Sequence, residues 1–271
     1  MNIQLKKFNM TDIKDDKVVV LIGKRETGKS FLVKDLLYYH QSIPIGTVIS
    51  GTESANSFYS DIIPSLFIHD EYTPGLIENV VKRQKLVVKK YKRDMGTNGR
   101  SRVDPRAFLI LDDCLYDKSW IKDTNIRTLF MNGRHYSMMF IITMQYALGI
   151  PPNLRTNIDY VFILREPYIS NRRRIWENYA GMFPTFESFS QVMDQCTENF
   201  ECLVIDNNSK SNKLHDQIFW YKAEPRGDFK LGSKEFWEIS KDLGSDDEEE
   251  VYNPNTPKKG TTRINVRKNK W

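Results

Sequence analysis

The residues with the clearest chemistry lie between Gly23 and Ser30, in the segment GKRETGKS. This segment follows the apolar run Val18–Ile22 and precedes a stretch with a helical pattern, 31–40. The order of strand, G-x-x-x-x-G-K-[ST] loop and helix predicts a phosphate-binding loop. Backbone N–H groups of such a loop, with the positive end of the helix dipole, face the phosphates of a nucleotide. The sequence therefore predicts a site for a nucleoside triphosphate.

Each position of the loop has an expected role. Gly23 and Gly28 permit torsions and close approaches that a Cβ would block. Lys29 is expected to reach the β- and γ-phosphates, and Ser30 to offer its hydroxyl to Mg²⁺. The predicted nucleotide-binding set is the whole loop: Gly23, Lys24, Arg25, Glu26, Thr27, Gly28, Lys29 and Ser30. For the three charged residues in the middle, contact with nucleotide or with a neighbouring subunit competes with the simpler interpretation of a solvated loop tip.

A second segment supplies carboxylates. The apolar run that begins at Ala107 ends in Asp112 and Asp113, the pattern of a Walker B strand. Such a strand lies beneath the nucleotide, and its first acid orders the Mg²⁺ shell. We assign Asp112 to the metal and Asp113 to orienting and polarising the attacking water. Many ATPases have Glu at the second position, and Asp is shorter by one methylene.

A third polar residue ends another apolar run. The segment 138–145 reads as a strand that delivers Gln145 at its carboxyl end, where α/β sheets place ligand contacts. An amide at this point can sense the γ-phosphate or the attacking water. The alternative is a Gln that only caps the strand.

The remaining apolar runs and helical patterns alternate along the chain. Strands are predicted at 46–51, 66–69, 158–165, 202–205 and 217–221, and helices at 74–93, 124–133, 172–180 and 185–196. His69, at the end of one strand, reads as a structural residue. Strands that alternate with helices favour an α/β fold with a mostly parallel sheet covered on both faces. We expect a P-loop domain at 17–243, an N-terminal extension at 1–16 and a charged, disordered tail at 244–271.

Composition narrows the class of protein. The chain has 271 residues, three scattered cysteines without metal-ligand spacing, and a net charge of +5. No apolar run approaches the roughly 18 residues needed to span a bilayer, and the first residues lack the apolar core of a signal peptide. We expect an intracellular protein with reduced cysteines and no membrane span. A mildly basic chain permits a nucleic-acid partner without requiring one.

Basic residues concentrate in the segment 82–106. Within it, 95–102 contains glycines and polar residues and is predicted to be an exposed, mobile loop. One interpretation is a solvated helix face with a flexible connector. The other is a segment that grips a phosphate backbone, since clustered Lys and Arg displace counterions there.

The segment 129–166 resembles the FtsK/HerA superfamily of DNA-pumping ATPases. A Gly-Arg helix end leads into a strand that ends in Thr-x-Gln, followed by a Pro-containing turn, an Arg-x-Asn-Ile element and a final strand ending in Arg165. Within this superfamily, three short segments are most similar to the poxvirus-type genome-packaging ATPases of nucleocytoplasmic large DNA viruses: Asn132-Gly133-Arg134-His135, Met144-Gln145-Tyr146 and Ile150-Pro151-Pro152. The resemblance spans about residues 15–221.

The resemblance implies a RecA/FtsK-like ATPase that uses ATP and Mg²⁺ and acts as a ring, expected to be a hexamer. Each site is then completed by an arginine of the neighbouring subunit. Arg134 matches that position, with Arg127, Arg155 and Arg165 as alternatives. The implied partners are double-stranded DNA, contacted through its phosphates, and capsid or portal-vertex proteins. The implied location is the host cytoplasm (a virus factory) or nucleus, or the virion.

Three other functions compete with DNA packaging. A cellular or plasmid translocase of the same superfamily generally carries membrane or accessory domains. A small-molecule P-loop kinase needs a lid and an acceptor pocket, and neither Gln145 nor Arg134 indicates either feature. A scaffold whose assembly is gated by nucleotide needs no hydrolysis.

Overall fold

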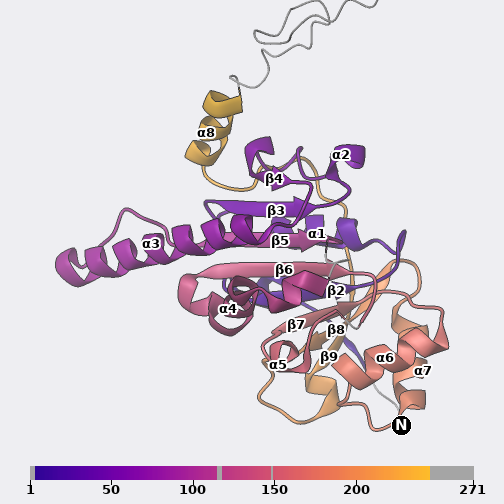
Figure 1. Cartoon of the computed structure of the whole chain (residues 1–271). Helices are drawn as coiled ribbons and strands as arrows, with labels where there is room; N and C mark the ends of the chain where they lie inside the picture. The colour runs from indigo at the N-terminus through magenta and orange to yellow at the C-terminus, as the bar shows by residue number, and fades with distance from the viewer. Residues whose placement is uncertain (1–3, 115–117, 148, 245–271) are drawn as a thin grey trace, which may run out of the picture.

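The computed structural model describes residues 4–114, 118–147 and 149–244. Within these residues the chain forms one nine-stranded sheet, in the order β1-β9-β8-β7-β2-β6-β5-β3-β4 (Figure 1). The strands are β1 (Lys6–Lys7), β2 (Val18–Ile22), β3 (Gly46–Ser50), β4 (Ile68–His69), β5 (Ala107–Asp112), β6 (Met138–Met144), β7 (Tyr160–Ile163), β8 (Glu201–Asp206) and β9 (Ile218–Lys222).

Strand β2 lies near the middle of the sheet and pairs in parallel with both β6 and β7. The strands β6, β5, β3 and β4 continue the parallel half, whereas β8 runs antiparallel to both β7 and β9. All residues of β2 and β6 are buried, because both faces of these strands are covered. The predicted α/β fold with a mostly parallel sheet is confirmed.

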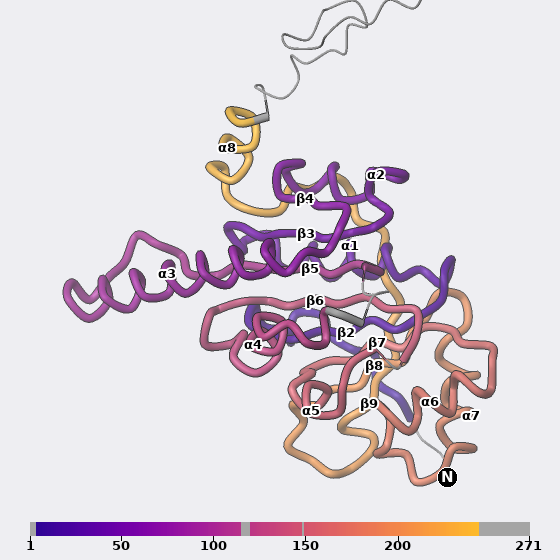
Figure 2. Tube along the Cα trace, viewed as in Figure 1, coloured from indigo at the N-terminus to yellow at the C-terminus, as the bar shows by residue number. Residues whose placement is uncertain are grey.

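Helices cover the two faces of the sheet. They are α1 (Lys29–Tyr38), α2 (Glu53–Asn56), α3 (Pro74–Asn98), α4 (Thr124–Asn132), α5 (Pro152–Arg155), α6 (Ile169–Tyr179), α7 (Phe186–Cys196) and α8 (Lys234–Gly244). Helices α3 to α7 pack on one face, and α1 with α8 on the other. Alternate residues of β2 enter the two cores, since Val18, Val20 and Ile22 face one and Val19 and Leu21 the other. Figure 2 follows the chain through both layers.

Helix α3 is longer than predicted. Thr73 caps its start by accepting from the Leu76 N–H. The helix ends at Asn98 and is capped by Gly99, which has φ 66° and donates to the Met95 carbonyl. The expectation of a loop from residue 95 is therefore wrong, because the left-handed cap forms at Gly99 and the exposed Gly96 does not interrupt the helix. The last turns extend away from the body of the protein (Figure 1).

The segment before residue 17 packs against the sheet. Strand β1 pairs with β9, and Phe8, Met10 and Ile13 are buried. The Phe8 ring meets Tyr160 and Phe162 edge-on, at 5.6 and 5.8 Å between ring centroids. Residues that we expected to form an extension thus contribute to the core. At the other end, Phe236 of α8 packs on Phe67 with ring centroids 4.4 Å apart.

His69 and the cysteines have the structural character expected of them. His69 ends the edge strand β4, and burial lowers its pKa. The three cysteines are free and buried, and burial raises the pKa of both Cys114 and Cys196 to about 12. None of the helices in the described ranges is long and apolar enough to cross a bilayer. Of the predicted tail, 244–271, Gly244 ends α8 and residues 245–271 lie outside those ranges.

Candidate functional site

Most of the predicted site residues meet at one edge of the sheet. Because β2, β3, β5 and β6 are parallel, their carboxyl ends lie side by side. The register pairs Ser50 with Asp112, Asp112 with Thr143, and Thr143 with Leu21. Four predicted residues are thereby collected at this line or just beyond it: Lys29, Asp112, Asp113 and Gln145.

The loop between β2 and α1 is tightly folded. A Cβ on Gly23 would lie 2.7 Å from Thr27 Oγ1 and 2.9 Å from Leu164 Cβ, so a side chain does not fit there. Gly28 has φ 95° and caps the N-terminus of α1, a conformation that favours glycine. The Thr27 hydroxyl donates to the Lys24 carbonyl at 2.7 Å. The loop therefore has the compact shape that a phosphate cradle requires.

Lys29 joins the loop to the Walker B strand. Its side chain is only 6% exposed, and Nζ donates to the Gly23 carbonyl at 2.7 Å. The same ammonium lies 3.1 Å from Asp113 Oδ2. A buried ammonium between a phosphate-binding loop and a carboxylate is placed to neutralise charge on a phosphate.

Asp112 is a buried carboxylate with two hydroxyl partners. Thr143 Oγ1 donates to Oδ1 at 2.5 Å, and Ser50 Oγ donates to Oδ2 at 3.4 Å. Burial raises the pKa of Asp112, and the Thr143 hydrogen bond opposes that shift. Sequence reasoning missed Ser50 and Thr143 as site residues. The sequence feature that could have identified them is their position, since each lies at the carboxyl end of a strand that pairs with β5.

Asp113 has an unusual backbone, with φ 47°. Its N–H donates to Thr143 Oγ1 at 3.0 Å, so one hydroxyl contacts both aspartates. Gln145 Nε2 lies 3.4 Å from Asp113 Oδ2. Two residues predicted separately, Asp113 and Gln145, therefore lie next to each other. A cavity of about 230 Å³ opens beside them, lined in part by Trp120 and Tyr146.

A buried tyrosine faces the same carboxylate. Tyr59 is fully buried, and its side chain lies next to Asp112. Burial raises its pKa well above the ordinary value, and the negative charge of Asp112 adds to the shift. The Glu53 carboxylate fixes this segment by accepting from the N–H groups of Tyr59 and Ser60. No sequence motif pointed to Tyr59 or Glu53.

The donors at this edge match a nucleoside triphosphate with Mg²⁺. Gly23 and Gly28 leave space where a Cβ would intrude, and Lys29 supplies a buried positive charge. Mg²⁺ takes oxygen ligands and usually needs only one or two from the protein when phosphates are present. Ser30, in the first turn of α1, and Asp112 offer such oxygens.

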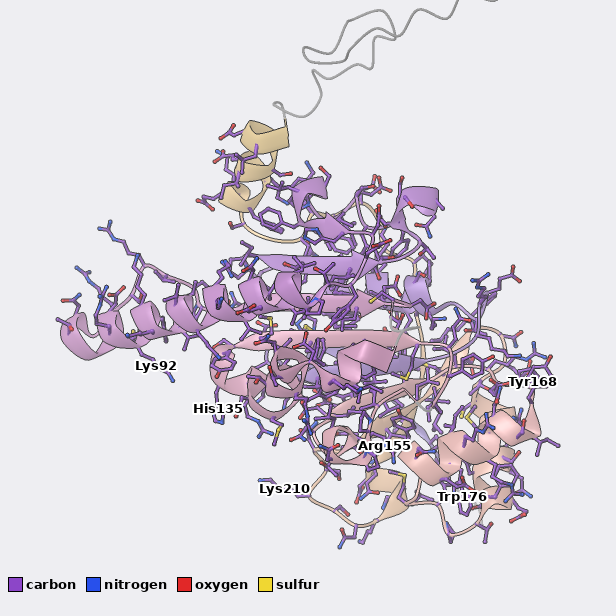
Figure 3. All side chains as sticks on the ribbon, in the orientation of Figure 1. Lys92, His135, Arg155, Tyr168, Trp176 and Lys210 are labelled. Carbon is purple, nitrogen blue, oxygen red and sulfur yellow. The ribbon has the colours of Figure 1, made fainter. Side chains whose placement is uncertain are left out.

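The charged residues inside the loop differ from one another. Arg25 and Glu26 are exposed, as a solvated loop tip requires. Lys24 is not, since its Nζ lies 3.5 Å from the centroid of the Tyr168 ring and 4.0 Å from Glu166 Oε1. The solvated interpretation is therefore wrong for Lys24, which ties the loop to the segment that follows β7. Tyr168 lies at the edge of the molecule, as labelled in Figure 3.

Arg134 lies at the opposite edge of the sheet from the loop. It is exposed in a 3₁₀ turn, Gly133–Tyr136, that precedes β6, and His135 beside it is labelled in Figure 3. Strand β6 has seven residues, which at about 3.3 Å each separates its ends by roughly 20 Å. Arg134 is thus outside the nucleotide site of its own chain, and its role in a neighbour's site stays a prediction.

The other arginines have different surroundings. Arg155 Cζ lies 5.6 Å from the centroid of the Tyr179 ring, and the guanidinium donates to the Ile150 carbonyl at 3.2 Å. Arg165 follows β7 on the loop's edge and lies 3.6 Å from Glu198. Arg127 is exposed on α4. Arg155 is therefore held within its own chain, whereas Arg127 is as accessible as Arg134.

The chain has relatives in several large DNA viruses. It is 39% identical to protein L437 of Acanthamoeba polyphaga mimivirus over 252 residues, which is 93% of this chain and 85% of that protein. It is 41% identical to protein 075L of Invertebrate iridescent virus 6, over 86% of this chain and 88% of that protein. No known protein-family profile matches the chain.

A solved viral structure shares the fold. The genome packaging NTPase B204 of Sulfolobus turreted icosahedral virus 2, in complex with AMPPCP, superposes with a TM-score of 0.54 at 20% identity, covering 79% of this chain and 100% of that one. The fold is thus that of a P-loop NTPase, as the motifs indicated. Mimivirus and the iridescent viruses are nucleocytoplasmic large DNA viruses, the group of viruses that the sequence resemblance indicated. The chain belongs to the family that includes mimivirus protein L437 and its iridescent-virus relatives.

Proposed function

We propose that this protein is an ATP-hydrolysing motor that moves double-stranded viral DNA into the capsid. The observation that carries the proposal is the meeting of Lys29, Asp112 and Asp113 at one sheet edge, with Lys29 Nζ 3.1 Å from Asp113. A phosphate-binding loop and a carboxylate pair are the parts that hydrolysis needs. The name of B204, a genome packaging NTPase, supports the choice of DNA packaging as the work performed.

The residues divide the chemistry among themselves. Lys29 and the N–H groups of the loop bind the phosphates, while Ser30 and Asp112 would hold Mg²⁺, which neutralises charge on the phosphate oxygens when bound. Asp113, kept in place by Lys29 and by its N–H bond to Thr143, orients the attacking water and takes up its proton. Gln145 adds an amide beside that carboxylate, at 3.4 Å.

A ring is part of the proposal. Arg134 lies at the far end of β6, so it reaches a nucleotide only if that edge faces the loop of a neighbouring subunit. In a ring, expected to be a hexamer, the edge that carries Arg134 in one subunit faces the phosphate-binding loop of the next subunit at every interface. Charge on the transferring phosphoryl group is then stabilised by the neighbour's guanidinium.

The candidate DNA contact is the arm formed by the end of α3. Residues 82–102 contain nine lysines and arginines and one acid, Asp94. In this half of α3 the buried residues are Gln84 and Val88, and none of the residues from 89 to 98 is buried. Residues 89–98 therefore extend free of the body, and Lys92 lies on this projecting part (Figure 3).

Most cations of the arm form no ion pair with the residues that the structure describes. Lys82 pairs with Glu78 at 2.6 Å, and Arg93 lies 3.9 Å from Asp94. Five others form no ion pair with any described residue: Lys89, Lys90, Lys92, Arg100 and Arg102. Unpaired cations on a projecting helix suit a phosphate backbone, which they contact without reading sequence. Arg106, at the base, is bound instead to Asp104 and Asp15, both at 2.6 Å.

The test is phosphate release by the assembled protein, measured with and without long duplex DNA and with no other phosphate acceptor. We expect DNA to stimulate release, Lys29→Ala to abolish it, and removal of residues 245–271 to leave it intact. Lys34→Ala, also on α1, is the matched control, because the Lys34 side chain makes no hydrogen bond or ion pair with the described residues. Turnover that ignores DNA contradicts the motor proposal.

The competing functions give different results in the same assay. A kinase requires an acceptor before phosphate leaves ATP. A scaffold keeps its full function, including ring formation, in a non-hydrolysing Asp113→Asn variant. Capsid or portal-vertex proteins as partners, and the virus factory, nucleus or virion as location, belong to the packaging proposal and are tested by labelling the protein in infected cells.

A further inference from the structure

Phe200 has an unusual backbone conformation and an exposed ring. It links α7 to β8 with φ 65°, directly after Asn199 with φ 52°. The residue is 67% exposed. Two consecutive left-handed residues without glycine are strained, and a bulky aromatic residue is rare in this region. Strain of this kind is retained where the surrounding structure demands a particular side-chain position.

The strained turn places Phe200 beside the phosphate-binding loop. Strand β8 runs antiparallel to β7, with Leu203 opposite Ile163, so β8 begins at the edge where β7 ends. A Cβ on Gly28 would lie 3.3 Å from Phe200 Cδ1. The ring therefore flanks the glycine that caps α1, and a long stretch of chain separates the two residues in sequence.

The order of the strands sets the direction of a bound nucleotide. The carboxylates that act at the terminal phosphate lie on the β6 and β5 side of β2, whereas β7 and β8 lie on its other side. When the terminal phosphate of a nucleotide lies next to Asp113, its nucleoside lies on the other side of β2, near β7 and β8. Phe200 is the exposed aromatic ring next to Gly28 on that side.

A neighbouring aromatic ring is already engaged. Lys24 Nζ lies over the Tyr168 ring at 3.5 Å, so one face of that ring is covered. We infer that Phe200 is the platform on which the base of the bound nucleotide stacks. The inference rests on the proposed nucleotide site and adds to it a subsite for a flat aromatic base, in which recognition is by stacking. Stacking tolerates different bases because every base has a π-face.

The experiment compares two ligands by calorimetry in the presence of Mg²⁺: β,γ-methylene ATP, which has a base, and inorganic tripolyphosphate, which has none. In Phe200→Ala and Phe200→Gly we expect affinity for the ATP analogue to fall by about tenfold or more, the effect of losing one base–aromatic stack. Affinity for tripolyphosphate should stay unchanged in both. Phe200→Trp should keep the affinity of the original protein for the ATP analogue.

The glycine variant gives a second readout. Glycine adopts φ 65° without strain, so Phe200→Gly should have a Tm equal to or above that of the original protein while it binds the ATP analogue less tightly. A purely structural role predicts the reverse, a lower Tm and unchanged affinity. Ile169→Ala is the matched control, because Ile169 is also 67% exposed but aliphatic and lies at the start of α6.

The outcomes are separable. If the variants lose affinity for both ligands equally, or for neither, Phe200 is not a base platform. If the original protein binds neither ligand, the proposed nucleotide site itself is wrong and the subsite falls with it. If the original protein binds both ligands, and Phe200→Gly has the same ratio of affinities for the ATP analogue and tripolyphosphate, only the base subsite is overturned.

Discussion

The hydroxyl of Thr143 donates a hydrogen bond to Asp112 Oδ1 at 2.5 Å, between two buried side chains on adjacent strands. The same oxygen accepts the N–H of Asp113 at 3.0 Å. One side chain on β6 thus helps to position both the carboxylate that ends β5 and the one that follows it. The orientation of the Walker B acids depends on the pairing of β5 with β6 as much as on the aspartates themselves.

Replacing Thr143 with Val should therefore impair both stability and turnover. The variant keeps the shape of the side chain but leaves a buried carboxylate without its closest donor, a loss of about 1–3 kcal/mol in the free energy of unfolding. Urea denaturation and phosphate release measure the two effects. Thr143→Ser retains the hydroxyl and is the control. Equal stability and turnover in the valine variant would show that the hydrogen bond does not matter.

Arg134→Ala should stop turnover without weakening nucleotide binding. A finger that acts in trans is worth on the order of 10³-fold in rate, while the arginine lies far from the loop of its own chain. Mixing subunits provides the decisive measurement, because an Arg134→Ala subunit beside a Lys29→Ala subunit forms one complete site. We expect the mixture to recover activity that neither variant has alone.

The matched control for that experiment is Arg127→Ala, since Arg127 is similarly exposed on α4. If Arg127→Ala abolishes turnover and Arg134→Ala does not, the finger is Arg127. Loss of nucleotide affinity in Arg134→Ala would contradict a role in trans.

The arm of α3 should control the salt dependence of DNA binding. Changing Lys89, Lys90, Lys92 and Arg93 together to Gln removes charges that displace counterions from DNA. The slope of log K against log salt should become less steep by about 0.9 for each DNA phosphate that the variant no longer neutralises. Phosphate release without DNA should not change. Fluorescence anisotropy with labelled duplex at several salt concentrations gives the slope.

Lys210→Gln with Lys213→Gln is the control for the arm, because these exposed lysines lie in the loop before β9. An arm variant that fails to form rings, rather than failing to bind DNA, would assign the arm to a contact between subunits.

Acid should weaken the contacts that join the N-terminal segment to the turn after α1 and to the segment before β5. Asp15 accepts from His40 Nδ1 and from Arg106 Nη1, both at 2.6 Å, and the His40 hydrogen bond lowers its pKa more than burial raises it. A depressed pKa means that the unfolded chain binds the proton more tightly. The stability that Asp15 contributes is complete above its ordinary pKa and is lost as the pH falls through the lower, folded value.

Asp15→Asn should therefore destabilise the protein at neutral pH, by about 1.5–3 kcal/mol for hydrogen bonds to a charged group, and the difference should shrink at acidic pH. Thermal unfolding across that pH range measures it. Asp61→Asn should show no such convergence, because Asp61 is exposed and its side chain forms no hydrogen bond or ion pair with the described residues.

The local parts of the site are encoded in continuous stretches of the chain. The loop from Gly23 to Ser30 is specified by a strand, glycines and a helix that follow one another directly, so its residues carry their own geometry. Asp112 and Gln145 follow from apolar strands that must end at the same edge of a parallel sheet. The helices and strands are predictable for a similar reason, because buried strands and amphipathic helices have clear periods.

The contacts that depend on register and on distant turns are specified by the assembled sheet. Ser50 and Thr143 reach Asp112 because three strands align residue by residue, which no single strand encodes. Lys24 meets Tyr168 because β7 lies next to β2, although its charge alone favoured solvent. Phe200 lies beside Gly28 because β8 runs antiparallel to β7, which places the turn before β8 next to the phosphate-binding loop. Residues far apart in the chain become neighbours only when the sheet forms, so pattern and spacing cannot reveal them.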